Sequence, residues 1–304
     1  MKPFVSVIIP NYNHAKYLDE RIGSVLHQTY QNFEVIILDD HSQDNSVEVI
    51  ERYRGHPKVS CILLNKQNSG STFIQWNKGI GVAKGELIWI AESDDSCAPD
   101  MLEELVDGYI NHPSCSLLFT LSITINSQGE FTGKKHSTRK NKLLVGSDFI
   151  RRYMVAGNYV SNASSAIFSR KVALEIDKAY MKYSGGGDRL FWIEIAEKGN
   201  VYILKRQLNF FRRHEGVVTD KRSLDGTNRR EAMWTYRYLI RGGYLKGLLR
   251  IAVLSYYRNA TICMPCESKQ VRQELYGLWG CNSFNKTPAV IFARLYTLWR
   301  KFYQ

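Results

Sequence analysis

Short apolar runs alternate with stretches of helical periodicity through the first half of the chain. Four runs rich in Val, Ile and Leu read as strands, and they lie at residues 4–10, 33–40, 58–65 and 86–91. Apolar residues recur at helical spacing in the segments between them. Strands that are apolar along their whole length are typical of a parallel sheet covered by helices on both faces. The sequence therefore predicts an α/β fold with a mostly parallel, Rossmann-like sheet.

The positive charge lies in the C-terminal third. Residues 1–200 carry 22 Lys and Arg against 23 Asp and Glu, whereas residues 201–304 carry 19 against 6, a net charge of +13. Such an excess favours phosphate-bearing partners, either an anionic membrane surface or nucleic acid, and acidic substrates are a third class. From about residue 227 the pattern is helical and basic, which predicts a helical C-terminal extension.

Two amphipathic segments lie in this basic region, at residues 244–258 and 288–304. Helices of this kind can lie at an anionic membrane interface, or their apolar faces can pack on the rest of the protein, and both readings stay open. The N-terminal apolar run covers only residues 4–10, too short for a signal peptide, and no window reaches the roughly 18 apolar residues of a membrane span. We therefore expect a cytoplasmic protein that can associate with the inner face of the cell membrane.

Acidic residues gather where the predicted strands end. Asp39 and Asp40 follow the second run, and Glu92, Asp94 and Asp95 follow the fourth. The carboxyl ends of parallel strands share one edge of the sheet, and ligands of open α/β sheets bind there. Any single residue of the first group, or Asp44 beyond it, can also be a turn former or a helix cap. The joint pattern favours a ligand site.

The first strand is followed by Asn11, Tyr12 and His14, with no glycine before Gly23. This excludes the Gly-rich turn of dinucleotide-binding folds and the Walker-type phosphate loop. A hard cation bridged by carboxylates is the remaining common way to hold phosphate. Because adjacent side chains point in different directions, we expect one of Asp94 and Asp95 to meet a metal and the other a ribose hydroxyl.

The chain resembles a family-2 glycosyltransferase of the GT-A fold. The resemblance is specific in "VSVIIPNYNHAKYLDERIGSVLHQTYQNFEVIILDDHSQDNS" and "NSGSTFIQWNKGIGVAKGELIWIAESDDSCAPD", and looser in the Gly-rich loop "SGGGD" and in "FFRRHEGVVT". It implies a nucleotide-diphosphate sugar donor, a saccharide or lipid-linked acceptor, and a divalent metal, Mn2+ or Mg2+.

The resemblance also implies roles for individual residues. Asp94 matches a ribose and nucleotide contact, and Asp95 matches the metal-binding end of the family's Asp-x-Asp element. Glu92 stands where the family usually has Asp, which leaves its role unassigned. Other matched positions contact the base or shape the donor pocket: Pro10, Tyr12 and Asp40 for the base, Asn77 and Lys84 for the pocket.

A sugar transfer with inversion needs a carboxylate base beside the acceptor hydroxyl. Asp188 follows three glycines, whose backbone freedom allows close approach to a ligand. Asp188 can also be a helix cap, and the two roles are compatible. The position resembles the Asp of the family's acceptor-site Glu-Asp pair, although Gly187 replaces the Glu. His214 resembles a histidine that meets metal or diphosphate in many relatives, and otherwise reads as a surface or packing residue.

The two arginines before His214, Arg212 and Arg213, could add positive charge against the leaving group. We predict a GT-A domain over residues 1–226, with a nucleotide-sugar half at 1–126 and an acceptor half at 145–226, and a basic extension at 227–304. The predicted activity is an inverting, metal-dependent sugar transfer in cell-surface polysaccharide synthesis.

Three other classes of protein are alternatives to this prediction. A sugar nucleotidyltransferase needs a Gly-rich, Arg-containing loop after the first strand, and "PNYNHAKY" does not supply it. A nucleic-acid-binding protein should carry its charge on a recognition fold, whereas here the charge follows an acidic-edged sheet, so no nucleic-acid partner is expected. A non-catalytic membrane-surface protein on an α/β scaffold is the third.

Overall fold

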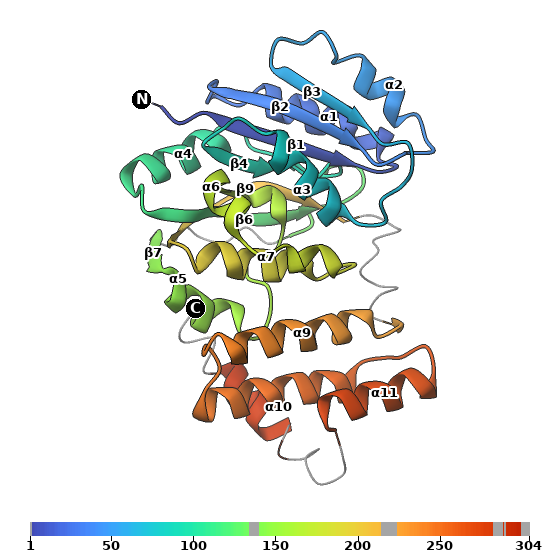
Figure 1. The fold of residues 1–304 in the computed structure, drawn as a ribbon, viewed down its shortest axis with the longest axis vertical. Coiled ribbons are helices and arrows are strands. Elements are labelled where there is room, and N and C mark those ends of the chain that lie inside the picture. The colour runs from blue at the N-terminus through green and yellow to red at the C-terminus, as the bar shows by residue number, and fades with distance from the viewer. Residues whose placement is uncertain (1, 134–139, 214–223, 282–287, 289, 299–304) are drawn as a thin grey trace. The chain divides into compact units, whose positions relative to one another are not determined.

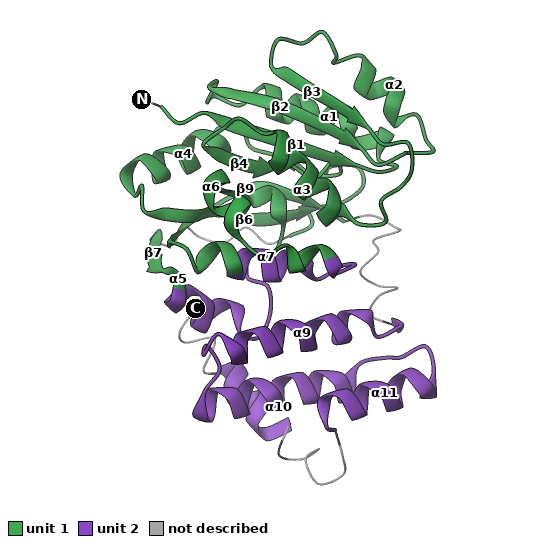
Figure 2. Cartoon of the chain, viewed as in Figure 1, with its two compact units in different colours: residues 1–146, 160–181, 194–215 green, residues 147–159, 182–193, 216–304 purple. Residues whose placement is uncertain are grey.

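The protein is described here by a computed structural model that covers residues 2–133, 140–213, 224–281, 288 and 290–298. These residues divide into two compact units (Figure 2). Unit 1 comprises residues 1–146, 160–181 and 194–215, and unit 2 comprises residues 147–159, 182–193 and 216–304. Each unit is considered by itself.

Unit 1 is built on one sheet, and its N-terminal half is parallel (Figure 1). Parallel pairing joins β3, β2, β1 and β4 in that order: Val59–Leu64, Phe33–Asp39, Val5–Asn11 and Leu87–Ile90. All residues of β1, β2 and β4 are buried. The mostly parallel sheet predicted from these apolar runs is confirmed.

The sheet continues with a mixed half. β8 (Ala166–Ser169) lies antiparallel between β4 and β6 (Cys115–Ile125), and β9 (Asn200–Arg212) runs parallel to β6. Two short strands, β5 (Ser96–Cys97) and β7 (Lys142–Val145), pair antiparallel with β9. The pairing of β5 with β9 brings the chain just after the acidic cluster against the end of β9.

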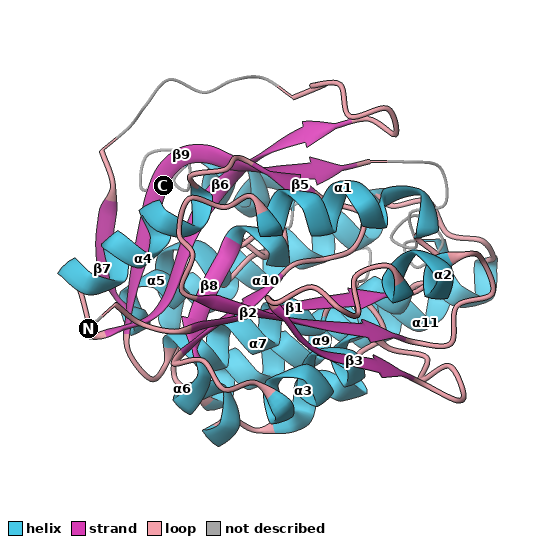
Figure 3. Cartoon of the chain, turned by 90° about the horizontal axis from the view of Figure 1, so that it is seen from above, coloured by secondary structure: helices cyan, strands magenta, loops and turns pink. Residues whose placement is uncertain are grey.

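Helices cover both faces of this sheet, as Figure 3 shows for α1 and α3. On one face α1 (Ala15–Leu26) and α4 (Met101–Asn111) bury apolar side chains in one cluster with alternate residues of β1, beginning with Val5, and α4 lies against β6 and β9. On the other face lies α3 (Thr72–Val82), where a Cβ on Gly79 would meet the Ile8 side chain at 2.5 Å. Only glycine permits this approach. The predicted two-sided cover is therefore present.

The remaining elements of unit 1 are short. α2 (Ser46–Glu51) follows β2, and α6 (Arg170–Glu175) and a 3-10 turn (Lys178–Lys182) follow β8. The β-rich run at residues 162–170 forms a strand only from Ala166. Its first part is a 3-10 turn, because the Asn162 side chain accepts a hydrogen bond from the Ser164 amide and holds the backbone in a turn.

Unit 2 is helical. It contains α9 (Thr227–Arg241), α10 (Gly247–Cys263), α11 (Lys269–Trp279) and helical residues at 290–298. An aromatic core joins these helices, in which the Tyr257 and Trp279 rings stack with centroids 4.7 Å apart and Tyr236 packs against both. The predicted helical C-terminal region is confirmed, while the predicted domain boundary at 226/227 stays a prediction.

Two earlier stretches of chain also belong to unit 2. They carry α5 (Gly146–Phe149) beyond its first residue, the π-helical turn Ile150–Met154, and the first part of α7 (Gly187–Ala196). The segment after β7 is thus a short α-turn followed by a π-turn. In the described part of the chain, no helix combines the length and hydropathy that a bilayer span requires.

Candidate active site

The carboxyl edge of β1 and β2 is shaped by two residues with left-handed backbone. Asn13 has a φ of 56° and His41 a φ of 63°. Such conformations are uncommon outside glycine and tend to cluster at functional sites. Pro10 lies buried within β1 opposite Leu38, while Tyr12 beyond the strand end is 45% exposed. Tyr12 is therefore accessible at this edge, whereas Pro10 is part of its floor.

Asp39 and Asp44 serve the loop that follows β2. The Asp39 carboxylate accepts hydrogen bonds from the Ser42 amide at 2.9 Å, the Ser42 hydroxyl at 2.6 Å and the Asn11 amide group at 2.8 Å. Asp44 accepts from the Ala15 amide at the start of α1 and from the Ser46 amide at the start of α2. For these two residues, the turn-and-cap reading describes what the structure contains.

Asp40 organises the segment between β3 and α3. It is 4% exposed, and its carboxylate accepts from Asn65, from Gln75, and from both the amide and hydroxyl of Ser69, at 2.6–2.9 Å. A carboxylate offers about four acceptor positions. The described residues supply four donors, three to Oδ1 and one to Oδ2, so a donor from the predicted nucleobase contact would have to compete with donors that already hold the loop.

The carboxylate of Asp95 links three parts of the sheet. Its Oδ2 accepts hydrogen bonds from Asn162 Nδ2 at 2.8 Å and Ser164 Oγ at 2.6 Å, both in the turn before β8, and its Oδ1 accepts from the Arg212 amide at the end of β9 at 3.0 Å. The residue is 1% exposed. Ser164 Oγ in turn accepts from the Glu92 amide at 3.0 Å. Asp95 therefore fixes the backbone around the acidic cluster.

Two buried arginines supply positive charge beside this cluster. Arg21 donates to the Glu92 carbonyl at 2.9 Å, and Arg212 donates from Nε to the Asp94 carbonyl at 2.7 Å and from Nη2 to Glu20 at 2.5 Å. The guanidinium of Arg212 donates to acceptors of the protein itself, and none of these contacts points to the predicted role against a leaving group. Arg213 is exposed.

The three acidic side chains differ in surroundings. Burial and then the neighbouring charge of Asp94 raise the pKa of Glu92 to about 8, and its carboxyl accepts from the Trp76 indole at 2.8 Å. The same two causes, in the same order, raise the pKa of Asp95. Asp94 is half-buried. The role of Glu92, which the sequence left open, is thus at least to anchor α3 through Trp76.

The donor set is compatible with a cation that takes few ligands from the protein. Within the part of the chain that the structure covers, no three His, Cys, Asp or Glu side chains converge as a complete metal site. Asp95 has three of its four acceptor positions filled, so it can offer one coordination position. Magnesium-type sites often use one or two carboxylates, with substrate phosphates completing the shell. A cation would also offset the mutual repulsion of these carboxylates.

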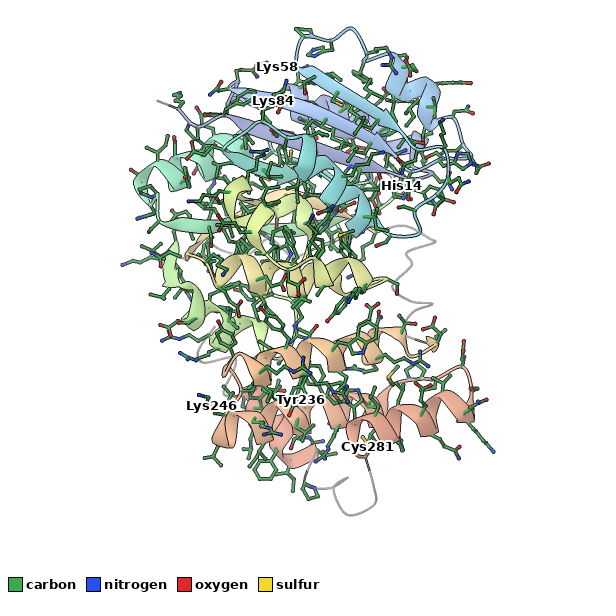
Figure 4. All side chains as sticks on the ribbon, in the orientation of Figure 1. His14, Lys58, Lys84, Tyr236, Lys246 and Cys281 are labelled. Atoms are coloured by element: carbon green, nitrogen blue, oxygen red, sulfur yellow. The ribbon has the colours of Figure 1, made fainter. Side chains whose placement is uncertain are left out.

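The positions expected to shape the donor pocket separate. Asn77 lies half-buried on α3. The backbone amide of Lys84 donates to Ser6 and Glu34 at the amino ends of β1 and β2. Figure 4 shows Lys84 beside Lys58 at that end of the sheet and His14 at the other. Lys84 therefore lies at the opposite end of the strands from the acidic edge.

Asp188 lies in unit 2, in the first turn of α7. Its Oδ1 accepts from the Arg189 amide at 2.7 Å and its Oδ2 from Asn158 Nδ2 at 2.7 Å. The residue is half-buried, and burial of the carboxyl raises its pKa to about 6 against the lowering effect of these two hydrogen bonds. A carboxylate with this pKa is ionised at neutral pH and can take up a proton. His214 lies outside the described residues.

Several residues of these environments carried no signal in the sequence. Asn158, Asn162 and Ser164 lie 30 to 69 residues from the carboxylates that they hold. His14, whose Nδ1 lies 2.8 Å from Ser93 Oγ, gave no signal in the sequence beyond the absence of a glycine after the first strand. The strand ends could be located from periodicity, but the donors that meet them could not.

The sheet order, the two-sided helical cover and the acidic strand edge define the GT-A type of fold. The chain belongs to glycosyltransferase family 2, since the family model described as Glycosyl transferase family 2 matches residues 6–175. The predicted family and enzyme class are confirmed. This outcome favours a glycosyltransferase over the nucleotidyltransferase, nucleic-acid-binding and non-catalytic alternatives.

Curated relatives agree with this assignment. The chain is 42% identical over 105 residues to glycosyltransferase GlyG of Streptococcus pneumoniae serotype 4, which covers 34% of this chain and 35% of that protein. It is 30% identical over 215 residues to poly(ribitol-phosphate) beta-N-acetylglucosaminyltransferase TarP of Staphylococcus aureus strain N315, covering 68% of this chain and 62% of TarP. The matched part thus spans about a third of GlyG and less than two thirds of TarP.

Solved structures show the same fold. TarS 1-349 of S. aureus in complex with UDP-GlcNAc aligns with a TM-score of 0.66 at 18% identity, over 95% of this chain and 79% of that one. Mannosyltransferase PcManGT of Pyrobaculum calidifontis, in complex with GDP-Man and Mn2+, aligns with a TM-score of 0.62 at 16% identity, over 99% of this chain and 84% of that one.

The hydrogen bonds of Asp95 and the charge of Asp94 predict unequal effects on the free energy of unfolding. Asp95→Ala should lower the free energy of unfolding by about 1–3 kcal/mol, because it leaves three buried donors without an acceptor. Asp94→Asn is the matched control. It removes a charge that raises the pKa of Glu92 and Asp95, so the free energy of unfolding should fall by less than in Asp95→Ala. Urea unfolding of both variants tests this, and equal destabilisation would contradict it.

Proposed function

We propose that this glycosyltransferase is an inverting enzyme that moves a sugar from a nucleotide-diphosphate donor to a hydroxyl of a saccharide or lipid-linked acceptor. Asp188 is the observation that carries the proposal. It is a half-buried carboxylate with a raised pKa, held by two donors and preceded by a glycine-rich loop. The described residues leave it two acceptor positions for the proton of an acceptor hydroxyl.

In the proposed reaction, Asp188 accepts the proton while the acceptor oxygen attacks the anomeric carbon. The bond from that carbon to the diphosphate breaks, and the nucleoside diphosphate leaves with the bonding electron pair. A divalent cation, Mn2+ or Mg2+, would when bound supply positive charge to this leaving group. Asp95 and His214 are the residues that would hold it.

The proposed donor contacts follow the family resemblance and lie along the carboxyl edge of unit 1 and on α3. Tyr12, exposed at the end of β1, and half-buried Asp94 are the accessible members. Pro10, Asp40 and Asn77 are proposed to line the same site. The names of TarS and PcManGT support a nucleotide-sugar donor.

The wider role is also a proposal. Curated relatives include the putative teichuronic acid biosynthesis glycosyltransferase TuaG of Bacillus subtilis and chondroitin synthase of Pasteurella multocida. Both names concern polysaccharide or cell-wall polymer synthesis. We place this protein in the assembly of a cell-surface polysaccharide, at the cytoplasmic face of the membrane.

Donor binding can be measured directly. In a thermal-shift screen of uridine, guanosine and thymidine diphosphate sugars with Mn2+ or Mg2+, one donor at about a hundredfold excess over its Kd should raise the free energy of unfolding by about 2.7 kcal/mol. EDTA should remove most of this shift. The corresponding nucleoside without phosphates is the control, since its shift should not depend on metal. Absence of stabilisation by every donor would contradict the proposal.

Asp188→Asn should lower kcat by about 10²- to 10⁴-fold and leave the donor-induced thermal shift unchanged. Folding should survive, because the buried Asn158 Oδ1 has no hydrogen-bond partner in the described residues and can accept from the new amide after a flip. The raised pKa of Asp188 means that its ionised form disfavours the native state above about pH 6. The neutral variant should therefore melt no lower at pH 7.

The exposed Asp177→Asn is the matched control, and it should transfer sugar at the wild-type rate. If Asp188→Asn also transfers at that rate, the base has been assigned to the wrong residue.

Apolar side chains on the C-terminal helices support the proposed membrane contact. Leu248 on α10 is 82% exposed, and Ile291, Leu295 and Leu298 form an exposed stripe at helical spacing. Exposed basic residues accompany them: Lys246, Arg250 and Arg294. The opposite faces of these helices are buried. Packing on the rest of the protein therefore accounts for one face of each helix, and the exposed face is available for a membrane surface.

The protein should therefore cosediment with phosphatidylglycerol-containing vesicles and not with pure phosphatidylcholine. A Leu248→Asp, Leu295→Asp double variant should lose most of this retention, because apolar insertion and anionic attraction both contribute. Leu174→Asp on α6, an exposed leucine of unit 1, is the control and should be retained like the wild type. Equal retention of all three proteins, or none by anionic vesicles, would contradict the proposal.

A further inference from the structure

A glutamate of α9 accepts four hydrogen bonds from the glycine-rich loop that precedes Asp188. Glu231 Oε1 accepts from the Ser184 amide at 2.5 Å and the Ser184 hydroxyl at 2.9 Å. Its Oε2 accepts from the amides of Gly185 at 3.2 Å and Gly186 at 2.6 Å. All of these residues belong to unit 2. One side chain of the C-terminal region therefore holds three successive residues of the loop.

The carboxylate of Glu231 is committed to this loop. The residue is 4% exposed, and none of the ion pairs found in the described residues involves it. A buried carboxylate needs such donors to offset its lost hydration. The loop amides supply them, so the loop conformation and the burial of Glu231 depend on each other.

The loop needs this support because its sequence does not specify a conformation. Gly185, Gly186 and Gly187 have no side chains to pack, and glycine loses the most conformational freedom on ordering. A Cβ on Gly186 would lie 3.2 Å from Glu231 Oε2, which is a tight contact. The glutamate is thus in close contact with the loop at Gly186, which lies two residues before the proposed base.

The start of α7 is fixed from other directions too. Arg189, next to the base, donates from Nε and Nη2 to the Met154 carbonyl at 3.0 and 2.7 Å, and from Nη1 to the Tyr257 hydroxyl on α10 at 2.5 Å. Asn158 holds the base itself. Glu231 holds the remaining segment, the loop residues Ser184 to Gly186 that lead into α7.

We propose that Glu231 is a positioning residue for catalysis, which holds the Ser184–Gly186 backbone so that Asp188 keeps the orientation needed to deprotonate the acceptor. The inference rests on the proposed role of Asp188. It makes the C-terminal helices part of the catalytic machinery, in addition to any membrane contact. No feature of the sequence pointed to Glu231.

The charge of Glu231 gives this role a signature beyond folding. The charged groups that act on Asp188 are Arg189, which lowers its pKa, and Glu231, which raises it, while burial is the largest cause of the raised value. The pH profile of kcat/KM, which reports ionisations of the free enzyme, should therefore fall on its acid side as Asp188 becomes protonated, near pH 6 in the wild type. Removing the Glu231 charge should move this acid limb to lower pH.

Two substitutions separate geometry from charge. Glu231→Gln keeps the length but presents an NH2 group to one pair of loop donors, and Glu231→Asp keeps the charge but is one methylene shorter. Both should lower kcat by about 10- to 100-fold, since small displacements of a catalytic group cost that much, with the donor Kd unchanged. Only Glu231→Gln should shift the acid limb. The control is Glu274→Gln on α11, which removes the same charge from a half-exposed ion pair with Arg230 and should change neither quantity.

Wild-type kcat and an unmoved acid limb in Glu231→Gln would overturn the inference. If Asp188→Asn also transfers at the wild-type rate, the proposed base fails, whereas full loss in Asp188→Asn with no effect in Glu231→Gln rejects the positioning role alone. If neither Glu231 variant folds, Ser184→Ala decides, because it removes one of the four hydrogen bonds and no charge. It should lower kcat about 2- to 10-fold at unchanged donor Kd, and an unchanged kcat would overturn the inference.

Discussion

The hydrogen bonds of the Asp95 carboxylate hold the carboxyl edge of the sheet together. They join the end of β4 to the turn before β8 and to the end of β9, segments 67 to 117 residues apart in the sequence. The cost of burying this charge is partly offset by three donors and by the nearby guanidinium of Arg21. Together with the arginines that donate to the Glu92 and Asp94 carbonyls, this carboxylate positions the turn of the acidic cluster, so the shape of any donor site at this edge depends on it.

The same logic explains why a cluster of acidic residues can stand at the end of a buried strand. Arg21 and Arg212 are both fully buried, and each donates to a backbone carbonyl of the cluster. The protein's own cations thus supply part of the positive charge that the sequence implied. A divalent cation would add positive charge at the acceptor position of Asp95 that its hydrogen-bond donors leave open in the described residues.

The sequence was sufficient for features that depend on local pattern and insufficient for those that depend on distant partners. Apolar runs located β1 to β4 and their acidic ends, because periodicity and strand length are local properties. The Ser184–Gly187 loop was visible through its glycines, but Glu231 was not, since it lies 45 residues beyond Gly186 in a polar stretch of sequence that gives no sign of its burial. For Asp39 and Asp44 the sequence left two roles open, turn former and ligand contact. Choosing between them requires knowing which donors reach each carboxylate, and the sequence does not contain that information.

Counting donors also distinguishes the roles that these carboxylates can play. Asp40 receives four hydrogen bonds, and Asp95 three, so both are mainly acceptors for the protein's own backbone and side chains. Asp188 receives two while burial raises its pKa to about 6. A carboxylate can take a proton from a substrate only through an acceptor position that the protein leaves open. By this criterion Asp188 is suited to act as a base, and Asp40 is suited to hold a loop.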